Sequence, residues 1–144
     1  MYWLINYLLK IILLFFIFYQ ILVVFIGLWK DITKYKIKLN DFLQRFSFYN
    51  KDIDNRQILI HAVSCGEANT SKPIIKSIEL KKKSYLLSIH TPTGYNLSKK
   101  FTNNSILKPF DTLPTIFYLF YRVKPKILLI MESDVWFFYI LLAK

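Results

Sequence analysis

The fold is decided by the stretch from Ile58 to Glu67, ILIHAVSCGE, in which a short apolar run ends in a small polar turn. A buried strand that stops at Ser-Cys-Gly-Glu and leads into a helix is typical of open α/β sheets, which carry their active sites at the strand ends. The turn delivers one carboxylate, that of Glu67, at its exit. We therefore take Glu67 as the first candidate for a functional residue.

Downstream of this stretch, apolar runs alternate with helical patterns. Strands are expected at 57–63, 85–90, 106–109 and 126–131, and helices at 67–82, 94–101, 113–123 and 134–142. Strands rich in Ile, Leu and Val that are separated by helices imply a parallel sheet covered on both faces, so the fold class is α/β. Pro73 predicts a kink in the first of these helices, or a regular helix that begins nearer Ser71.

The N-terminal 29 residues are apolar on every side and hold one charge, that of Lys10. About 20 such residues cross the hydrocarbon of a bilayer, so residues 1–29 are expected to form a membrane anchor helix. A cleaved signal peptide fits less well, because the run is too long and lacks a basic start. A helix buried in a soluble core is the other alternative, but so small a domain could not surround it.

Basic residues follow the anchor, and residues 30–56 are interpreted as a basic linker with a short helix at 39–48. By the positive-inside rule, Lys30, Lys34, Lys36 and Lys38 place the following domain, residues 57–144, on the cytoplasmic face of the inner membrane.

Residues 30–144 carry 19 basic and 9 acidic groups, which is +10 of the net charge of +11. Beside an apolar anchor, this excess indicates anionic membrane lipids or a phosphorylated lipid as partners. Nucleic acid is not expected, because no Arg-rich or aromatic-interleaved pattern is present. The single cysteine, Cys65, fits a reducing compartment, and no Cys/His spacing predicts a metal site.

The loops that leave the carboxyl ends of parallel strands lie along one edge of the sheet, so four polar loops should converge on one crevice. They are residues 64–67, 91–94, 110–111 and 132–134. Within the first loop, Gly66 is expected to let the backbone turn tightly. Glu67, at the start of a helix, is either a general base for an attacking hydroxyl or a partner of its own helix N-terminus.

The other loops carry similar alternatives. Thr91-Pro-Thr-Gly94 is either a cradle for phosphate or sugar oxygens or an ordinary helix N-cap. Glu132 follows a run that is buried by pattern, so it is either functional or paired with a nearby lysine or amide.

Taken together, these motifs resemble the N-terminal half of the Kdo (3-deoxy-D-manno-octulosonic acid) transferases of lipopolysaccharide biosynthesis. The segment from Ile60 to Glu67 is similar to the family's HAVSVGE block, and His90-Thr-Pro-Thr-Gly94 is similar to its TPTG loop. Pro109-Phe-Asp111 with Pro114 resembles its P-x-D-x-x-P segment, and the stretch from Ile130 to Trp136 resembles its METELW block.

The resemblance implies a Rossmann-like acceptor domain of a GT-B glycosyltransferase and an inverting, metal-independent transfer of Kdo. The donor would be CMP-Kdo, with no cofactor, and the acceptor a lipid A precursor. By motif, Glu67 matches the catalytic base and Glu132 the acidic residue that stabilises the transition state. Ser64, Gly66, Thr91, Thr93 and Gly94 would bind the acceptor.

The chain also departs from the family pattern. It has Phe137-Phe138 where the family has Pro-Asn, and Glu132-Ser-Asp134 where the family has Glu-Thr-Glu. The family's C-terminal donor domain has no counterpart before Lys144, so we expect the chain alone to lack the donor site, and whether it is by itself an enzyme stays open.

Three hypotheses follow from these matches and departures. The first is the acceptor half of an enzyme whose donor half is encoded separately. The second is a non-catalytic remnant or glycolipid-binding module, and the third is an unrelated membrane-anchored α/β protein.

Overall fold

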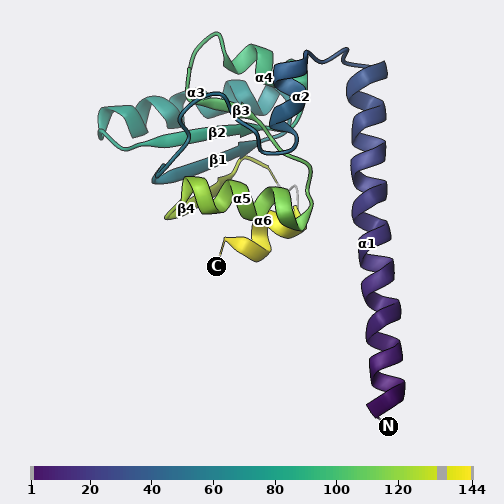
Figure 1. Cartoon of the computed structure of the whole chain (residues 1–144). Coiled ribbons are helices and arrows are strands. Elements are labelled where there is room, and N and C mark those ends of the chain that lie inside the picture. The colour runs from purple at the N-terminus through teal and green to yellow at the C-terminus, as the bar shows by residue number, and fades with distance from the viewer. Residues whose placement is uncertain (1, 133–135, 144) are drawn as a thin grey trace.

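The computed structural model describes residues 2–132 and 136–143 and shows an α/β domain beside one long helix (Figure 1). The domain is built on a four-stranded parallel sheet in the order β3-β2-β1-β4. The strands are β1 (Ile58–Ala62), β2 (Tyr85–Ile89), β3 (Ser105–Leu107) and β4 (Ile127–Ile130). The parallel sheet predicted from the apolar runs is therefore confirmed.

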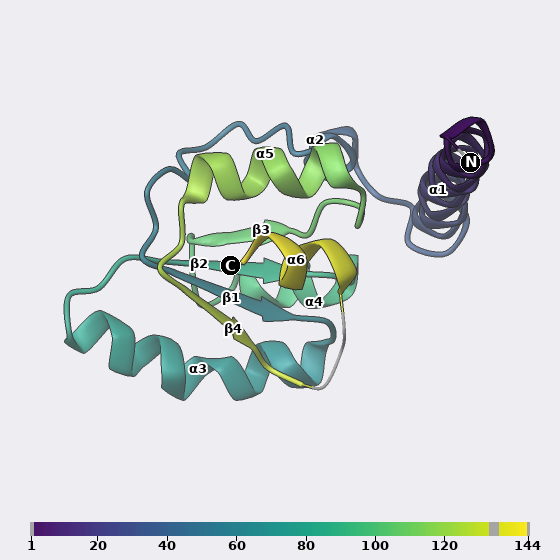
Figure 2. The same cartoon turned by 90° about the horizontal axis from the view of Figure 1, so that it is seen from below.

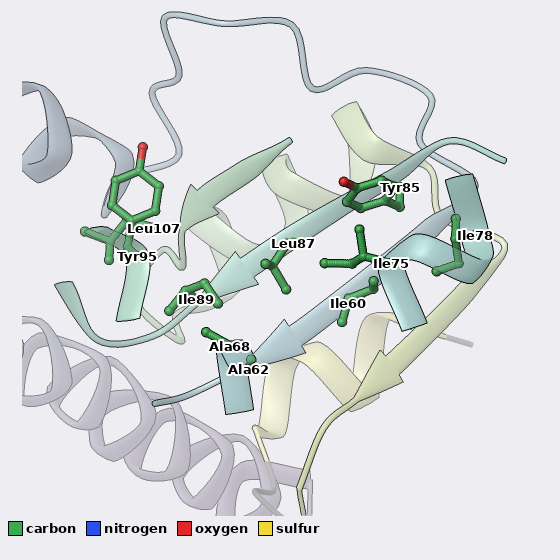
Figure 3. Packing of buried hydrophobic residues seen from close by; sticks show 10 residues of the cluster. All are labelled: Ile60, Ala62, Ala68, Ile75, Ile78, Tyr85, Leu87, Ile89, Tyr95 and Leu107. Atoms are coloured by element: carbon green, nitrogen blue, oxygen red, sulfur yellow. The ribbon is translucent and has the colours of Figure 1, made fainter. Parts of the chain in front are cut away.

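Helices cover both faces of the sheet, as Figure 2 shows. One face carries α3 (Cys65–Leu80) and α4 (Pro92–Ser98), and the other carries α5 (Leu113–Val123) and α6 (Phe137–Leu142). The sheet side chains alternate between the two layers, because successive residues of a strand point to opposite faces. Ile60 and Leu87 pack with Ile75 of α3 (Figure 3), whereas Leu59 and Leu86 pack on the side of α5.

Two helical predictions are corrected in their details. Of the two alternatives for Pro73, the helix boundary near Ser71 is wrong, because α3 runs from Cys65 through Pro73 without a break, whereas the kink stays a prediction. The short helix expected at 39–48 is α2 (Leu39–Gln44). It ends early because the chain turns at Ser47, whose φ of 65° is left-handed and whose hydroxyl donates a hydrogen bond to the carbonyl of Thr115. The last predicted helix began at Asp134, which lies outside the described residues.

The long helix α1 (Tyr2–Thr33) is apolar and long enough to cross a membrane, with no side chain of the candidate span's most apolar window buried in the protein. At about 1.5 Å per residue its 32 residues extend about 48 Å. Its N-terminal part projects beyond the domain in Figure 1, whereas its C-terminal part lies beside the domain. An apolar helix of this kind can anchor the chain in a membrane.

The domain is joined to α1 by specific contacts. The ring of Phe16 meets that of Phe138 edge to face, with centroids 5.9 Å apart. The side-chain oxygen of Gln20 accepts a 2.9 Å hydrogen bond from the backbone N–H of Leu113. Gly27 lies so close to the ring of Phe110 that a Cβ at this position would overlap it.

A buried ion pair completes this connection. The guanidinium of Arg45 donates two hydrogen bonds to the carboxylate of Asp31, at 2.7 and 2.9 Å, and both side chains are 3% exposed. Arg45 also donates to the backbone oxygen of Lys108 at the end of β3. The segment interpreted as a linker is thus fixed to the sheet.

Replacing Asp31 with asparagine should destabilise the domain by about 3–5 kcal/mol, because the buried Arg45 charge would lose its counter-charge. The measurement is urea unfolding of the full chain in detergent micelles, followed by near-UV circular dichroism. Asp52→Asn is the control: its pair with Arg56 is exposed, and the expected loss stays within ~1 kcal/mol. Equal losses in the two variants would contradict a structural role for the buried pair.

Candidate active site

The turn between β1 and α3 forms a capping box around Ser64 and Glu67. The hydroxyl of Ser64 accepts a hydrogen bond from the N–H of Glu67 at 3.3 Å. In return the two carboxylate oxygens of Glu67 accept from the N–H groups of Ser64, at 3.1 Å, and Val63, at 2.7 Å. The carboxylate is therefore bound to the N-terminus of its own helix, which was one of the two roles anticipated for it.

This arrangement also bears on the use of Glu67 as a base. The residue is only 5% exposed, and its charge is compensated by backbone amides and the helix dipole. Each oxygen of an ionised carboxylate has two lone-pair positions, so each keeps one free position beside its amide hydrogen bond. The geometry supports capping directly and leaves room for one further hydrogen bond at each oxygen.

The loop between β2 and α4 lies directly against the first turn. Thr91 is the N-cap of α4, and its hydroxyl accepts from the N–H of Gly94 at 3.3 Å. The same hydroxyl donates to the carbonyl of Val63 at 2.9 Å. Gly94 is so close to the other loop that an added Cβ would lie 3.1 Å from the backbone carbon of Ser64. The structure thus brings Ser64, Glu67, Thr91 and Gly94 together.

The two remaining acceptor candidates are placed differently. Thr93 is exposed on the first turn of α4. Gly66 is also exposed and lies in the first turn of α3, and none of the described glycines has a positive φ. The expectation that Gly66 permits a tight turn is wrong, because an ordinary helical φ is open to any residue.

Glu132 follows β4 and is exposed. Among the described residues it has no hydrogen-bond or ion-pair partner, and Asp134, the other acid of this loop, lies outside them. Because β4 pairs in parallel with β1, Glu132 lies at the same edge of the sheet as Ser64 and Glu67. The structure places Glu132 at the expected edge without showing what it contacts.

A cavity of about 360 Å³ lies between the end of α1 and the strand ends. Its apolar part is contributed by α1 and Phe110, and its polar part by both α1 and the loops. The lining residues are Val23, Ile26, Gly27, Lys30, Asp31, Lys34, Tyr35, Arg45, His90, Thr91, Pro92, Phe110, Asp111 and Trp136. Of the candidate catalytic and acceptor-binding residues, Thr91 lines it, whereas Glu67 and Glu132 do not.

Sequence reasoning missed Lys108, which lies beneath this cavity. Its side chain is 0% exposed, and its pKa is lowered from the ordinary value of 10.5 to about 7 by burial, against the opposing charge of Asp111 and with a smaller contribution from the charge of Arg45. The available signal was a lysine in the apolar run Ile106-Leu-Lys-Pro-Phe110. Such a lysine needs a partner or a purpose.

The two histidines of the chain flank Lys108 and are neutral. Burial, followed by the charge of Lys108, lowers the pKa of His61 to about 3 and that of His90 to about 2. The Nδ1 of His61 lies 3.2 Å from the carbonyl oxygen of Ser88, so Nδ1 carries the proton and Nε2 is an acceptor. Neither histidine is charged at neutral pH, and the described residues contain no cluster of three His, Cys, Asp or Glu suited to a metal ion.

Comparison with known proteins adds two findings. Residues 40–144 match the sequence model of the family described as 3-deoxy-D-manno-octulosonic-acid transferase (kdotransferase). A bifunctional glycosyltransferase/methyltransferase of Fusobacterium nucleatum subsp. nucleatum is 33% identical over 89 residues, which are 58% of this chain and 14% of the relative. The chain thus spans a small part of the length of this curated relative.

The two glycines of the site should respond oppositely to alanine. In Gly94→Ala the new Cβ would lie 2.9 Å from a methyl carbon of Ile89 and 3.0 Å from the Thr91 hydroxyl, so we expect a loss of about 1–3 kcal/mol. In Gly66→Ala the Cβ meets only the Ser64 hydroxyl, at 3.6 Å, and alanine should stabilise the helix by up to ~1 kcal/mol. Urea unfolding measures both, and a stable Gly94→Ala variant would refute the close approach of the loops.

Proposed function

Because the chain belongs to the 3-deoxy-D-manno-octulosonic-acid transferase family, we propose that it is the acceptor-binding half of a Kdo transferase. The reaction is transfer of Kdo from CMP-Kdo to the lipid A precursor, lipid IVA, in lipopolysaccharide biosynthesis. The observation that carries the proposal is the family match over residues 40–144. The name of the Fusobacterium relative supports glycosyl transfer as the reaction class.

The cavity beside α1 is the proposed acceptor site, because its lining suits a phosphorylated glycolipid. Val23, Ile26 and Phe110 offer apolar surface on the side of the membrane helix, and Lys30 and Lys34 offer positive charge near its C-terminal end. An amphiphile that is anchored by its acyl chains would thereby bring its phosphates and sugar to the edge of the sheet. In this proposal the two loops beside the cavity bind the acceptor. Their acceptor-binding residues are Ser64, Gly66, Thr91, Thr93 and Gly94.

The chemistry assigned to this edge is a single inverting displacement without a metal ion. The acceptor hydroxyl oxygen attacks the anomeric carbon of Kdo, the bond from that carbon to the CMP phosphate oxygen breaks, and CMP leaves with the electron pair. Glu67 takes the hydroxyl proton through a free lone-pair position, and Glu132 stabilises the positive charge that develops on the sugar.

Such a transfer requires donor and acceptor in one cleft, and in the GT-B arrangement the donor occupies a second domain that faces this edge. We assign the CMP-Kdo site to that domain, either elsewhere on a longer polypeptide or on a separately encoded one. We assign the acceptor domain to the cytoplasmic face of the inner membrane, among anionic lipids, because basic residues follow α1 and such residues favour the cytoplasmic side. The proposed function involves no nucleic-acid partner.

One observation favours a second candidate, a non-catalytic membrane-anchored remnant or glycolipid-binding module. Both carboxylate oxygens of Glu67 already serve the helix N-terminus, as a purely structural residue would. This candidate keeps acceptor binding in the cavity and drops the transfer.

The test replaces Glu67 and Glu132 with glutamine, singly, in the source organism and measures Kdo transfer in its membranes from labelled CMP-Kdo to lipid IVA. We expect Glu67→Gln to lower the rate by roughly 10²–10⁴, the usual range for loss of a general base. Glu132→Gln should also lower it. Glu79→Gln is the matched control, because Glu79 lies in the same helix but is exposed near its other end.

The outcomes separate the two candidates. Unchanged transfer in both variants, with saturable binding of lipid IVA to the purified chain, would replace the enzyme with the binding module. If lipid IVA does not bind to the purified chain and neither variant changes the transfer rate, both candidate functions are refuted. Thermal unfolding of each variant shows whether a lost rate reflects the lost cap rather than the lost base.

A further inference from the structure

Among the described residues, Lys108 is the one fully buried amine, and its contacts are unusual. Its Nζ lies 3.7 Å from the ring centroid of Trp136 and 4.8 Å from that of Tyr139. It lies 3.9 Å from an oxygen of Asp111, which is within range of an ion pair and too long for a hydrogen bond. Within the described part of the chain, Nζ has no hydrogen-bond partner.

Polar groups around Lys108 also lack hydrogen-bond partners. The Trp136 indole nitrogen, one Asp111 oxygen and the Nδ1 of His90 are buried and lack partners among the described residues. These three residues line the cavity beside α1. The Trp136 ring also contacts that of His90, with centroids 4.7 Å apart and ring planes tilted by 39°, so the indole contacts both Lys108 and a second residue of the cavity lining.

We propose that Lys108 is a positioning residue for this cavity: its ammonium holds the Trp136 ring through a cation–π contact and the Asp111 carboxylate through charge. The cation–π contact is strong here because Nζ is removed from water. Asp111 is held from a second side, since the backbone N–H groups of Phe137 and Phe138 at the start of α6 lower its pKa after burial raises it. Lys108 thus connects the end of β3 to two residues of the cavity lining, Trp136 and Asp111.

Both interactions, the cation–π contact with Trp136 and the charge interaction with Asp111, require the protonated form of Lys108. The titratable or charged groups that face it are His61 on β1, His90 after β2, Asp111 before α5, Arg45 after α2 and Tyr139 on α6. Both histidines have a pKa near 2 to 3, and burial raises that of Tyr139 well above 10, so none of these three titrates near neutral pH. Because the pKa of Lys108 is about 7, the ammonium is present below pH 7 and is lost as the pH rises through it.

A merely structural role predicts a different response to substitution. Replacing a whole buried ion pair with apolar side chains can leave a protein at least as stable, but removing one partner leaves the other charge uncompensated. Lys108→Met should therefore lower the thermal midpoint of the full chain, because Asp111 loses its counter-charge, and it should in addition lose the hold on Trp136, which a merely structural role would not predict. Lys108→Arg keeps a positive charge throughout the neutral range.

The experiment follows the fluorescence of Trp136 in the full chain in lipid nanodiscs, with Trp3 and Trp29 replaced by phenylalanine, from pH 5.5 to 9. The unmodified Lys108 should give a change in emission with a midpoint near 7. Lys108→Met should show the high-pH emission at every pH, and Lys108→Arg the low-pH emission. His90→Gln should keep the midpoint.

The inference is overturned if Lys108→Met retains the midpoint, if His90→Gln abolishes it, or if no change occurs in the unmodified protein. A second readout, lipid IVA binding, rests on the proposed function: it should weaken on the order of tenfold above pH 7 and become independent of pH in Lys108→Arg. If lipid IVA does not bind at any pH while the Trp136 change persists, the proposed function fails and the role of Lys108 stands.

Discussion

The buried ion pair between Asp31 and Arg45 is the contact on which the arrangement of the site depends. Two charges removed from water must be paired and hydrogen-bonded, and here the pairing joins the end of α1 to the segment after α2. Arg45 reaches further, since its guanidinium donates to the carbonyl of Lys108 and its own carbonyl accepts from the N–H of Phe110. The apolar helix α1 is thereby held against the strand-end edge, and both residues of the pair line the cavity.

The same edge brings the motif loops together through small side chains and shared backbone groups. Thr91 bonds to the carbonyl of Val63, and Gly94 approaches the backbone of Ser64 more closely than a residue with a Cβ could. The parallel order β3-β2-β1-β4 makes this possible, because β1 and β2 are neighbours that end at the same side. The two motif loops are therefore one packed unit.

Charge at this edge is distributed unevenly. Each carboxylate oxygen of Glu67 accepts a hydrogen bond from a backbone amide, whereas the amine of Lys108 and one oxygen of Asp111 have no hydrogen-bond partner among the described residues. The unsatisfied groups gather around Trp136, between the sheet and the cavity. Such a cluster differs from a stabilising core, because buried polar groups without partners oppose folding.

The sequence by itself determined the α/β class, the four strands and the long apolar N-terminal helix, because period and apolar runs are local properties of the chain. It also located Glu67, Thr91 and Glu132 at strand ends by motif. The tertiary structure decided the rest: that Pro73 is tolerated inside α3, that Gly94 and not Gly66 requires glycine, and that α1 lines the site. Lys108 belongs to this second group, because its environment is made by Trp136, Asp111 and Tyr139 together with the strand ends. Contacts between residues far apart in sequence leave no local pattern, so only the packed structure reveals them.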